Sequence, residues 1–106
     1  MYLIVVKFPV KPEYAEQWPE LVRAYTEPTE AEPGNKWFEW SRSLKDPNEY
    51  VLVEAFEDDG AGPHVQSEHF AQMQQEFPQY LSATPQIVSR QVEGEGWDEM
   101  GELKVD

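Results

Sequence analysis

Two strand-like runs separated by a short connector lie at the centre of this chain and constrain its fold more than any other feature. Residues 36–43, KWFEWSRS, and residues 49–57, EYVLVEAFE, are rich in the aromatic and β-branched side chains that strands favour. The connector LKDPN between them carries Asp, Pro and Asn, which are typical turn residues. The pattern therefore predicts an antiparallel hairpin.

A helix is predicted before the hairpin. Pro12 suits the first turn of a helix, and Pro19 predicts a kink or a restart near Trp18 because proline removes one backbone hydrogen bond. The prolines and the glycine of 27–34, EPTEAEPG, predict the end of the helix and a loop. The apolar residues spaced as one helix face are Tyr14, Trp18, Leu21, Val22 and Tyr25.

A second helix is predicted after the hairpin. The segment DDGAGP, 58–63, interrupts the chain, and Pro63 can begin a helix that Pro78 ends. The apolar face expected of this single helix consists of Val65, Phe70, Met73 and Phe77.

A strand is predicted at each end of this arrangement, over 2–9, YLIVVKFP, and over 85–93, PQIVSRQVE. The order β-α-β-β-α-β predicts an α+β, ferredoxin-like domain over residues 1–95, with a four-stranded antiparallel sheet and both helices on one face. Because the first strand is apolar on both alternating sets, the open face of the sheet should be covered by a second copy of the chain. We therefore expect a homodimer.

The C-terminal tail, 96–106, is polar apart from four residues. The spacing of the last three predicts a short strand that crosses to the partner subunit. The four apolar residues are Trp97, Met100, Leu103 and Val105.

Composition excludes several classes of function. The chain has 106 residues, enough for one domain, and 21 acidic against 8 basic residues give a net charge of −13. Nucleic acids and anionic membranes are therefore not expected as partners. The absence of cysteine excludes disulfides and thiolate sites. The apolar opening, MYLIVVKFPV, is too short to span a bilayer and resembles no leader, so a cytoplasmic protein is expected.

The two histidines, His64 and His69, are five residues apart. On one continuous helix this spacing would separate them by about 140°, so we do not expect them to form a ligand pair. No phosphate-binding loop, dinucleotide fingerprint or nucleophile elbow occurs in the sequence. We therefore expect no metal and no cofactor.

The aromatic residues of 36–43 leave two interpretations open. Alternation places Asn35, Trp37 and Glu39 on one face of the strand, and Trp40 on the other. The tryptophans could pack in a core or interface, or could line a small-molecule cavity. Likewise, Asn35 could be a turn residue or a catalytic one.

Three further polar residues have alternative roles. His69 could be a satisfied interior histidine or a general base, and His64 could interact with the helix end. Glu54 lies in the middle of the strongest strand, where a carboxylate needs a partner, and Arg42 or Arg90 is the expected one.

Residues 32–70 resemble the antibiotic biosynthesis monooxygenase superfamily, especially its small quinol-monooxygenase-like members. The similarity consists of a Pro-Gly turn at 33–34, an S-x-x-x-P-x-x-[FY]-V-L-x-E run that ends at Glu54, and an H-x-x-S-x-H-F run from His64 to Phe70.

The resemblance implies a dimeric α+β barrel whose enzymatic members oxidise quinols, anthrones or polyphenols with O2, without flavin, haem or metal. It implies a catalytic role for Asn35, which matches by position, and His64 and His69 match the family's histidine pattern. The predicted catalytic residues are therefore Asn35, His69 and His64. The small aromatic substrate would then be bound by Trp37, Trp40, Tyr50, Phe56 and Phe70.

Two alternatives remain within this fold. The chain could be a non-catalytic barrel that binds a small hydrophobic ligand, because fold alone does not determine function. A haem-degrading enzyme is less well supported, because that branch needs an axial histidine where this chain has Met73 and Gln74.

Overall fold

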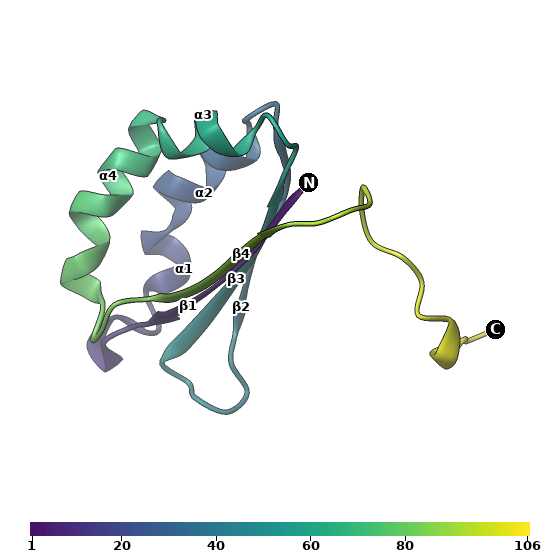
Figure 1. The fold of residues 1–106 in the computed structure, drawn as a ribbon. Coiled ribbons are helices and arrows are strands. Elements are labelled where there is room, and N and C mark those ends of the chain that lie inside the picture. The colour runs from purple at the N-terminus through teal and green to yellow at the C-terminus, as the bar shows by residue number, and fades with distance from the viewer.

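The computed structural model describes residues 1–106, and its central feature is a four-stranded antiparallel sheet in the order β2-β3-β1-β4. The helices that connect the strands cover one face of this sheet, and none of them lies on the other face (Figure 1). The α+β ferredoxin-like fold predicted from the order of the elements is confirmed. The strands are β1 (Tyr2–Pro9), β2 (Asn35–Arg42), β3 (Glu49–Phe56) and β4 (Gln86–Gln91).

β1 lies inside the sheet and pairs with both β3 and β4. Its Ile4 lies opposite Glu54 on β3 and opposite Ser89 on β4. β2 pairs antiparallel with β3, which confirms the predicted hairpin. The pairing places Glu54, a potentially charged residue, in the middle of the sheet.

The first helical region is divided into η1 (Pro12–Tyr14), α1 (Trp18–Leu21) and α2 (Arg23–Glu30). α1 begins at Trp18 and has Pro19 in its first turn, which confirms the interruption predicted near Trp18, and a second break follows at Val22. However, α2 continues through Pro28, where the sequence predicted that the helix would end. Pro28 lacks a backbone N–H, so the helix loses one hydrogen bond there. The next residue, Thr29, adds one, because its Oγ1 donates to Tyr25 O at 2.7 Å.

The second helical region is not the single helix that the sequence predicts. It consists of α3 (Ala61–Val65), α4 (Glu68–Glu76) and η2 (Phe77–Tyr80). The break lies at Ser67, whose Oγ accepts a hydrogen bond from Phe70 N and donates one to His64 O. Ser67 is thus the N-cap of α4 and ties its start to the end of α3.

The core lies between the helices and the covered face of the sheet. Trp18 is fully buried and packs against Phe77 at 5.0 Å and Phe8 at 5.7 Å between ring centroids. These aromatic contacts fill the end of the layer beneath α1.

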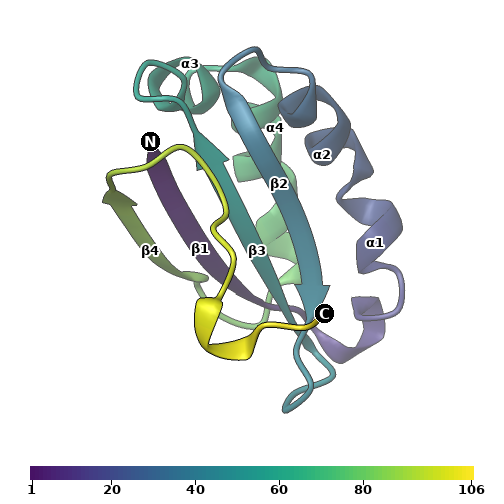
Figure 2. The same ribbon diagram turned by 90° about the vertical axis from the view of Figure 1, so that its right-hand side faces the viewer.

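The open face of the sheet carries half-buried apolar side chains from three strands, namely Leu3, Val5, Trp37, Val51 and Val53. The C-terminal tail leaves β4 on this side (Figures 1 and 2). Its Trp97 lies against Trp37, with ring centroids 5.2 Å apart. Residues Gly101–Leu103 form the 3-10 turn η3, so the short strand predicted in the tail is absent from the single chain. None of the helices has both the length and the apolar character that a bilayer crossing needs.

Candidate functional site

A cavity of about 530 Å³ lies between the covered face of the sheet and the helices α3 and α4. Its walls are mostly apolar and include Ile4, Val6, Phe70, Met73 and Ile87. Tyr25, Glu54 and His64 also line it and provide potential hydrogen-bonding groups. An apolar chamber with a few polar groups is typical of a small-molecule site.

The buried His64 imidazole forms part of the cavity wall. Its Nε2 lies 3.0 Å from the Tyr25 hydroxyl and 3.8 Å from Glu54 Oε1. Phe56 stacks on the ring, with centroids 4.6 Å apart, and fixes its plane. The Nε2 edge of His64 is therefore directed toward the polar groups of the cavity.

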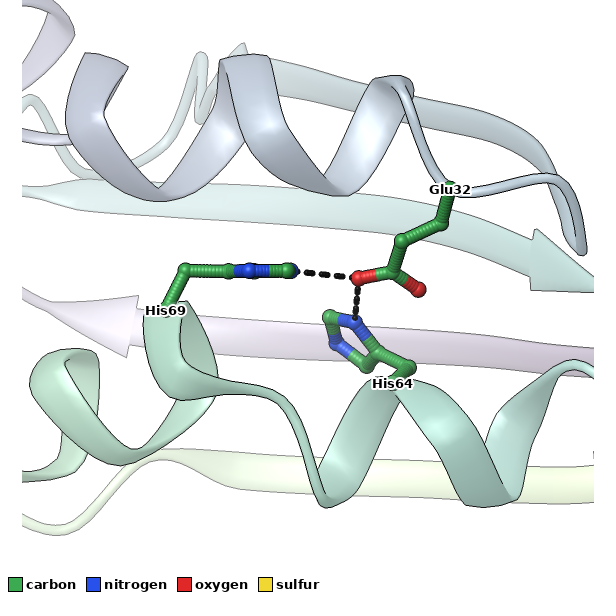
Figure 3. Close-up of side chains that lie close together, drawn as sticks. All are labelled: Glu32, His64 and His69. Atoms are coloured by element: carbon green, nitrogen blue, oxygen red, sulfur yellow. Dashed lines mark hydrogen bonds and ion pairs between the residues drawn. The ribbon is translucent and has the colours of Figure 1, made fainter.

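The opposite edge of His64 contacts Glu32, which lies in the turn after α2. His64 Nδ1 is 2.8 Å from Glu32 Oε2, and His69 Nε2 contacts the same oxygen (Figure 3). The expectation that the two histidines point apart is wrong, because it assumed one continuous helix. The break at Ser67 redirects α4, so that both imidazoles converge on one carboxylate.

The hydrogen bonds define the tautomer of a neutral His64. A carboxylate only accepts, so His64 Nδ1 carries the proton and donates it to Glu32 Oε2. Nε2 is then free to accept from the Tyr25 hydroxyl. Burial lowers the pKa of His64, and this effect outweighs the hydrogen bond and the charge of Glu32. Burial, with smaller contributions from Glu54 and Glu32, raises the pKa of Tyr25.

Glu54 has neither of the expected arginine partners. Arg42 Nη2 binds Glu16 Oε1 at 2.8 Å, and Arg90 Nη1 donates to Ser89 O. Glu54 Oε1 is buried and has no hydrogen-bond partner. Burial, assisted by the nearby charge of Glu32, raises the pKa of Glu54 to about 8.

Asn35 does not share a face with Trp37, contrary to the alternation that the sequence suggested. An irregularity in the β2–β3 pairing at this point places Asn35 opposite Phe56 and Trp37 opposite Ala55. One extra residue in a bulge reverses the side on which later side chains lie. The Asn35 amide donates to Trp37 O at 3.0 Å and to Ala55 O at 3.3 Å.

Of the eight site residues predicted from the sequence, His64 and Phe70 line the cavity. His69 lies behind it, on the far side of Glu32. Trp40 packs on Trp18 and donates its indole N–H to Thr26.

The remaining predicted aromatic residues lie in other surroundings. Tyr50 is buried and donates its hydroxyl hydrogen to Ala15 O. Phe56 is buried behind His64, and Trp37 lies on the open face of the sheet.

Sequence reasoning did not assign Tyr25, Glu32 or Glu54 to the site. Tyr25 was part of the apolar stripe of the first helix, and nothing in that spacing indicates that its hydroxyl reaches a histidine 39 residues away. Glu32 is the first residue of the stretch that carries the family resemblance, and this was the only sequence feature that could have drawn attention to it. Glu54 is buried in the sheet, as its place in the strand predicted, but the arginine partner predicted for it is absent.

Comparison with known proteins agrees with this fold. A sequence profile described as antibiotic biosynthesis monooxygenase matches residues 1–76. A solved structure from Nitrosomonas europaea, named as a candidate member of that family, has 27% sequence identity and a TM-score of 0.77, covering 87% of this chain and 98% of its own. A similarly named structure from Deinococcus radiodurans has 18% identity and a TM-score of 0.81, covering 95% and 100%, respectively.

None of the curated protein sequences compared with this chain matches it. The profile nevertheless covers more than half of the residues, including β1 to β3, His64 and His69. The chain therefore belongs to the antibiotic biosynthesis monooxygenase family.

Proposed function

We propose that this protein is a cofactor-independent monooxygenase or quinol oxidase that uses O2 to oxidise an electron-rich aromatic compound, such as a quinol, an anthrone or a polyphenol. The cavity is the observation that carries this proposal, because its volume of about 530 Å³ and its apolar walls suit a small aromatic molecule. Membership of the family supports the class of reaction.

In the proposed first step, the substrate loses a proton to His64 through Tyr25. A substrate hydroxyl donates to the Tyr25 oxygen while the Tyr25 proton moves to His64 Nε2, 3.0 Å away. Glu32 accepts from the other ring nitrogen and stabilises the imidazolium that forms. The result is a substrate anion in an apolar chamber.

The substrate anion then reduces O2. Transfer of one electron gives a substrate radical and superoxide, which combine to form a C–O bond and a peroxide anion. The peroxide takes the proton back from His64 and loses water, leaving a quinone oxygen on the ring. With a quinol, two electrons and two protons pass to O2 instead, giving the quinone and hydrogen peroxide.

The other predicted site residues have different roles in this proposal. We assign His69 a positioning role, because it contacts Glu32 and does not line the cavity. Phe70 forms part of the wall. The Asn35 amide donates to two backbone carbonyls. The catalytic role predicted for Asn35 stays a prediction.

The test is oxidation of menadiol or an anthrone by chelator-treated protein, with and without O2. The protein should accelerate O2 consumption above the spontaneous rate. Tyr25→Phe should lower kcat by about two orders of magnitude, the usual contribution of general acid–base catalysis. Tyr14→Phe is the matched control, because the Tyr14 ring packs on Tyr80 away from the cavity. No acceleration by the unmodified protein would remove the enzymatic proposal.

A non-catalytic role predicts a different outcome for the same protein. A flat aromatic ligand would then raise the melting temperature progressively as its concentration increases. Oxidation would stay at the spontaneous rate, with O2 present or absent. Ligand binding without turnover would thus favour a binding module over an enzyme.

We further propose that the chain forms a homodimer through the open face of the sheet. The half-buried apolar side chains of that face support the proposal, as does Val88, which is 56% exposed. Sedimentation equilibrium should give twice the mass of one chain. A monomer at micromolar concentration would contradict it.

A further inference from the structure

We propose that Glu32, His64 and His69 bind one divalent transition-metal ion, of the Zn²⁺ class, on the side of His64 that faces away from the cavity. The candidate ligand atoms, one from each residue, all lie within 4.8 Å of one another. They come from three separate elements, namely the turn after α2, helix α3 and helix α4 (Figure 3). Convergence of this kind is what a metal centre requires.

The donor types select the metal. Two imidazole nitrogens and one carboxylate oxygen form a set that binds zinc and its neighbours and leaves a further coordination position open. Calcium and magnesium prefer sites made of oxygen atoms, so they fit this cluster poorly. The cluster therefore favours Zn²⁺, Co²⁺, Ni²⁺ or Cu²⁺.

The charges around the cluster also favour a cation. The basic side chains within 4 Å of the Glu32 carboxyl group are His64 and His69, and the one near the Glu54 carboxyl group is His64. No lysine or arginine pairs with either of these carboxyl groups. A divalent ion would supply the positive charge that the surrounding side chains lack.

The unpartnered oxygen of Glu54 is a second, independent observation. Only 4% of Glu54 is exposed, and its Oε1 has no hydrogen-bond partner. If a metal occupies His64 Nδ1, the ring proton resides on Nε2, which faces Tyr25 Oη at 3.0 Å and Glu54 Oε1 at 3.8 Å. Metal-bound histidines almost always donate their other N–H to an oxygen of this kind. Glu32 Oε1, also buried without a partner, is available as an additional ligand.

The metal site goes beyond the proposed oxidation and does not depend on it. Metal binding places the proton on His64 Nε2, whereas the oxidation needs Nε2 free to accept one. The two states therefore exclude each other, and an occupied site should suppress turnover.

The experiment is a titration of chelator-stripped, full-length protein with Co²⁺ and Zn²⁺. One equivalent of Co²⁺ per chain should produce the visible absorption bands of a low-coordinate nitrogen–oxygen site, and Zn²⁺ should displace it. His69→Gln keeps an amide N–H that can donate to Glu32 and loses the imidazole ligand. This variant should fold and should bind Zn²⁺ at least about tenfold more weakly.

Glu68→Gln is the matched control, because Glu68 is an exposed acid next to His69 and is outside the cluster. It should bind Zn²⁺ as the unmodified protein does. Absence of one-to-one binding by the unmodified protein, or unchanged affinity in His69→Gln, would overturn the proposal. Neither result bears on oxidation, which is measured in the chelator-treated protein.

Discussion

The backbones of Gly34 and Gly60 are in direct contact, so closely that a Cβ added to Gly34 would lie 2.5 Å from Gly60 Cα. The contact joins the turn that carries Glu32 to the segment that leads into α3, and Glu57 N donates to Gly34 O at 2.8 Å beside it. Glycine is required at both positions because no other residue allows this approach. The two glycines thereby hold Glu32 within reach of His64.

Gly34→Ala should therefore destabilise the protein by about 1–3 kcal/mol, the usual cost of an overpacked contact. It should also separate Glu32 from His64. Gly62→Ala is the matched control, because a Cβ there meets nothing within 4 Å. Replacement of a helical glycine at that open position should stabilise the fold slightly. Urea unfolding of both variants checks this, and equal stability of the two would contradict the structural role of the contact.

Ser67→Ala should cost about 1 kcal/mol, because it removes the N-cap of α4. The Oγ of Ser67 both accepts from Phe70 N and donates to His64 O, so the loss should also loosen the angle between α3 and α4. Ser67→Asp keeps an acceptor for the Phe70 amide and should recover most of the stability. Thermal unfolding of the pair measures the difference. If Ser67→Asp is no more stable than Ser67→Ala, the cap is not what fixes this junction.

Unfolding of the metal-free protein should depend on pH through Glu54. Its pKa is about 8 in the folded chain, compared with an ordinary value of 4.5. The folded state holds this proton more tightly, so the contribution to stability is complete below about pH 4.5 and is lost as pH rises through 8. The titratable groups that face Glu54 are Glu32, His64 and Tyr25.

Glu54→Gln should reduce the decline in the free energy of unfolding between pH 5 and pH 8. His64 acts in the opposite direction, because its lowered pKa makes the folded state more stable as pH rises. The difference between the variant and the unmodified protein therefore isolates Glu54. Urea titrations in the presence of a chelator measure it, and parallel pH profiles for the two proteins would show that the Glu54 pKa is not raised.

Deletion of residues 96–106 should weaken the proposed dimer by at least about tenfold in the dissociation constant, since loss of one buried aromatic contact costs more than 1 kcal/mol. Trp97 is 72% exposed and Met100 is 66% exposed in the single chain, which leaves both available to a partner subunit. Asp98→Asn, an exposed polar change in the same segment, should have no effect. Sedimentation velocity across a dilution series measures the constants. Identical values for the full and shortened chains would show that the tail does not cross to the partner.

The strands and their order along the chain could be predicted from the sequence because side-chain type and alternation act locally. Residues 2–9 were predicted as the first strand, and β1 has these bounds. The hairpin turn was likewise encoded by neighbouring residues, Asp46 to Asn48. These features need no information about distant parts of the chain.

The site could not be predicted in the same way, because its contacts join distant segments. Glu32 meets His69 across 37 residues, and Tyr25 meets His64 across 39. The side assigned to Asn35 was wrong because a bulge has no signature in alternation. Ser67 followed by Glu68 is a helix-start pattern that was available in the sequence and would have divided the second helix correctly.

Because the chain bends at Ser67, the geometry of the site also depends on the number of residues between His64 and His69. One residue inserted into α4 ahead of His69 would turn its imidazole by about 100° around the helix axis and away from Glu32. Among chains of this fold, the length of this short interval should thus separate those that can bring two imidazoles to one carboxylate from those that cannot.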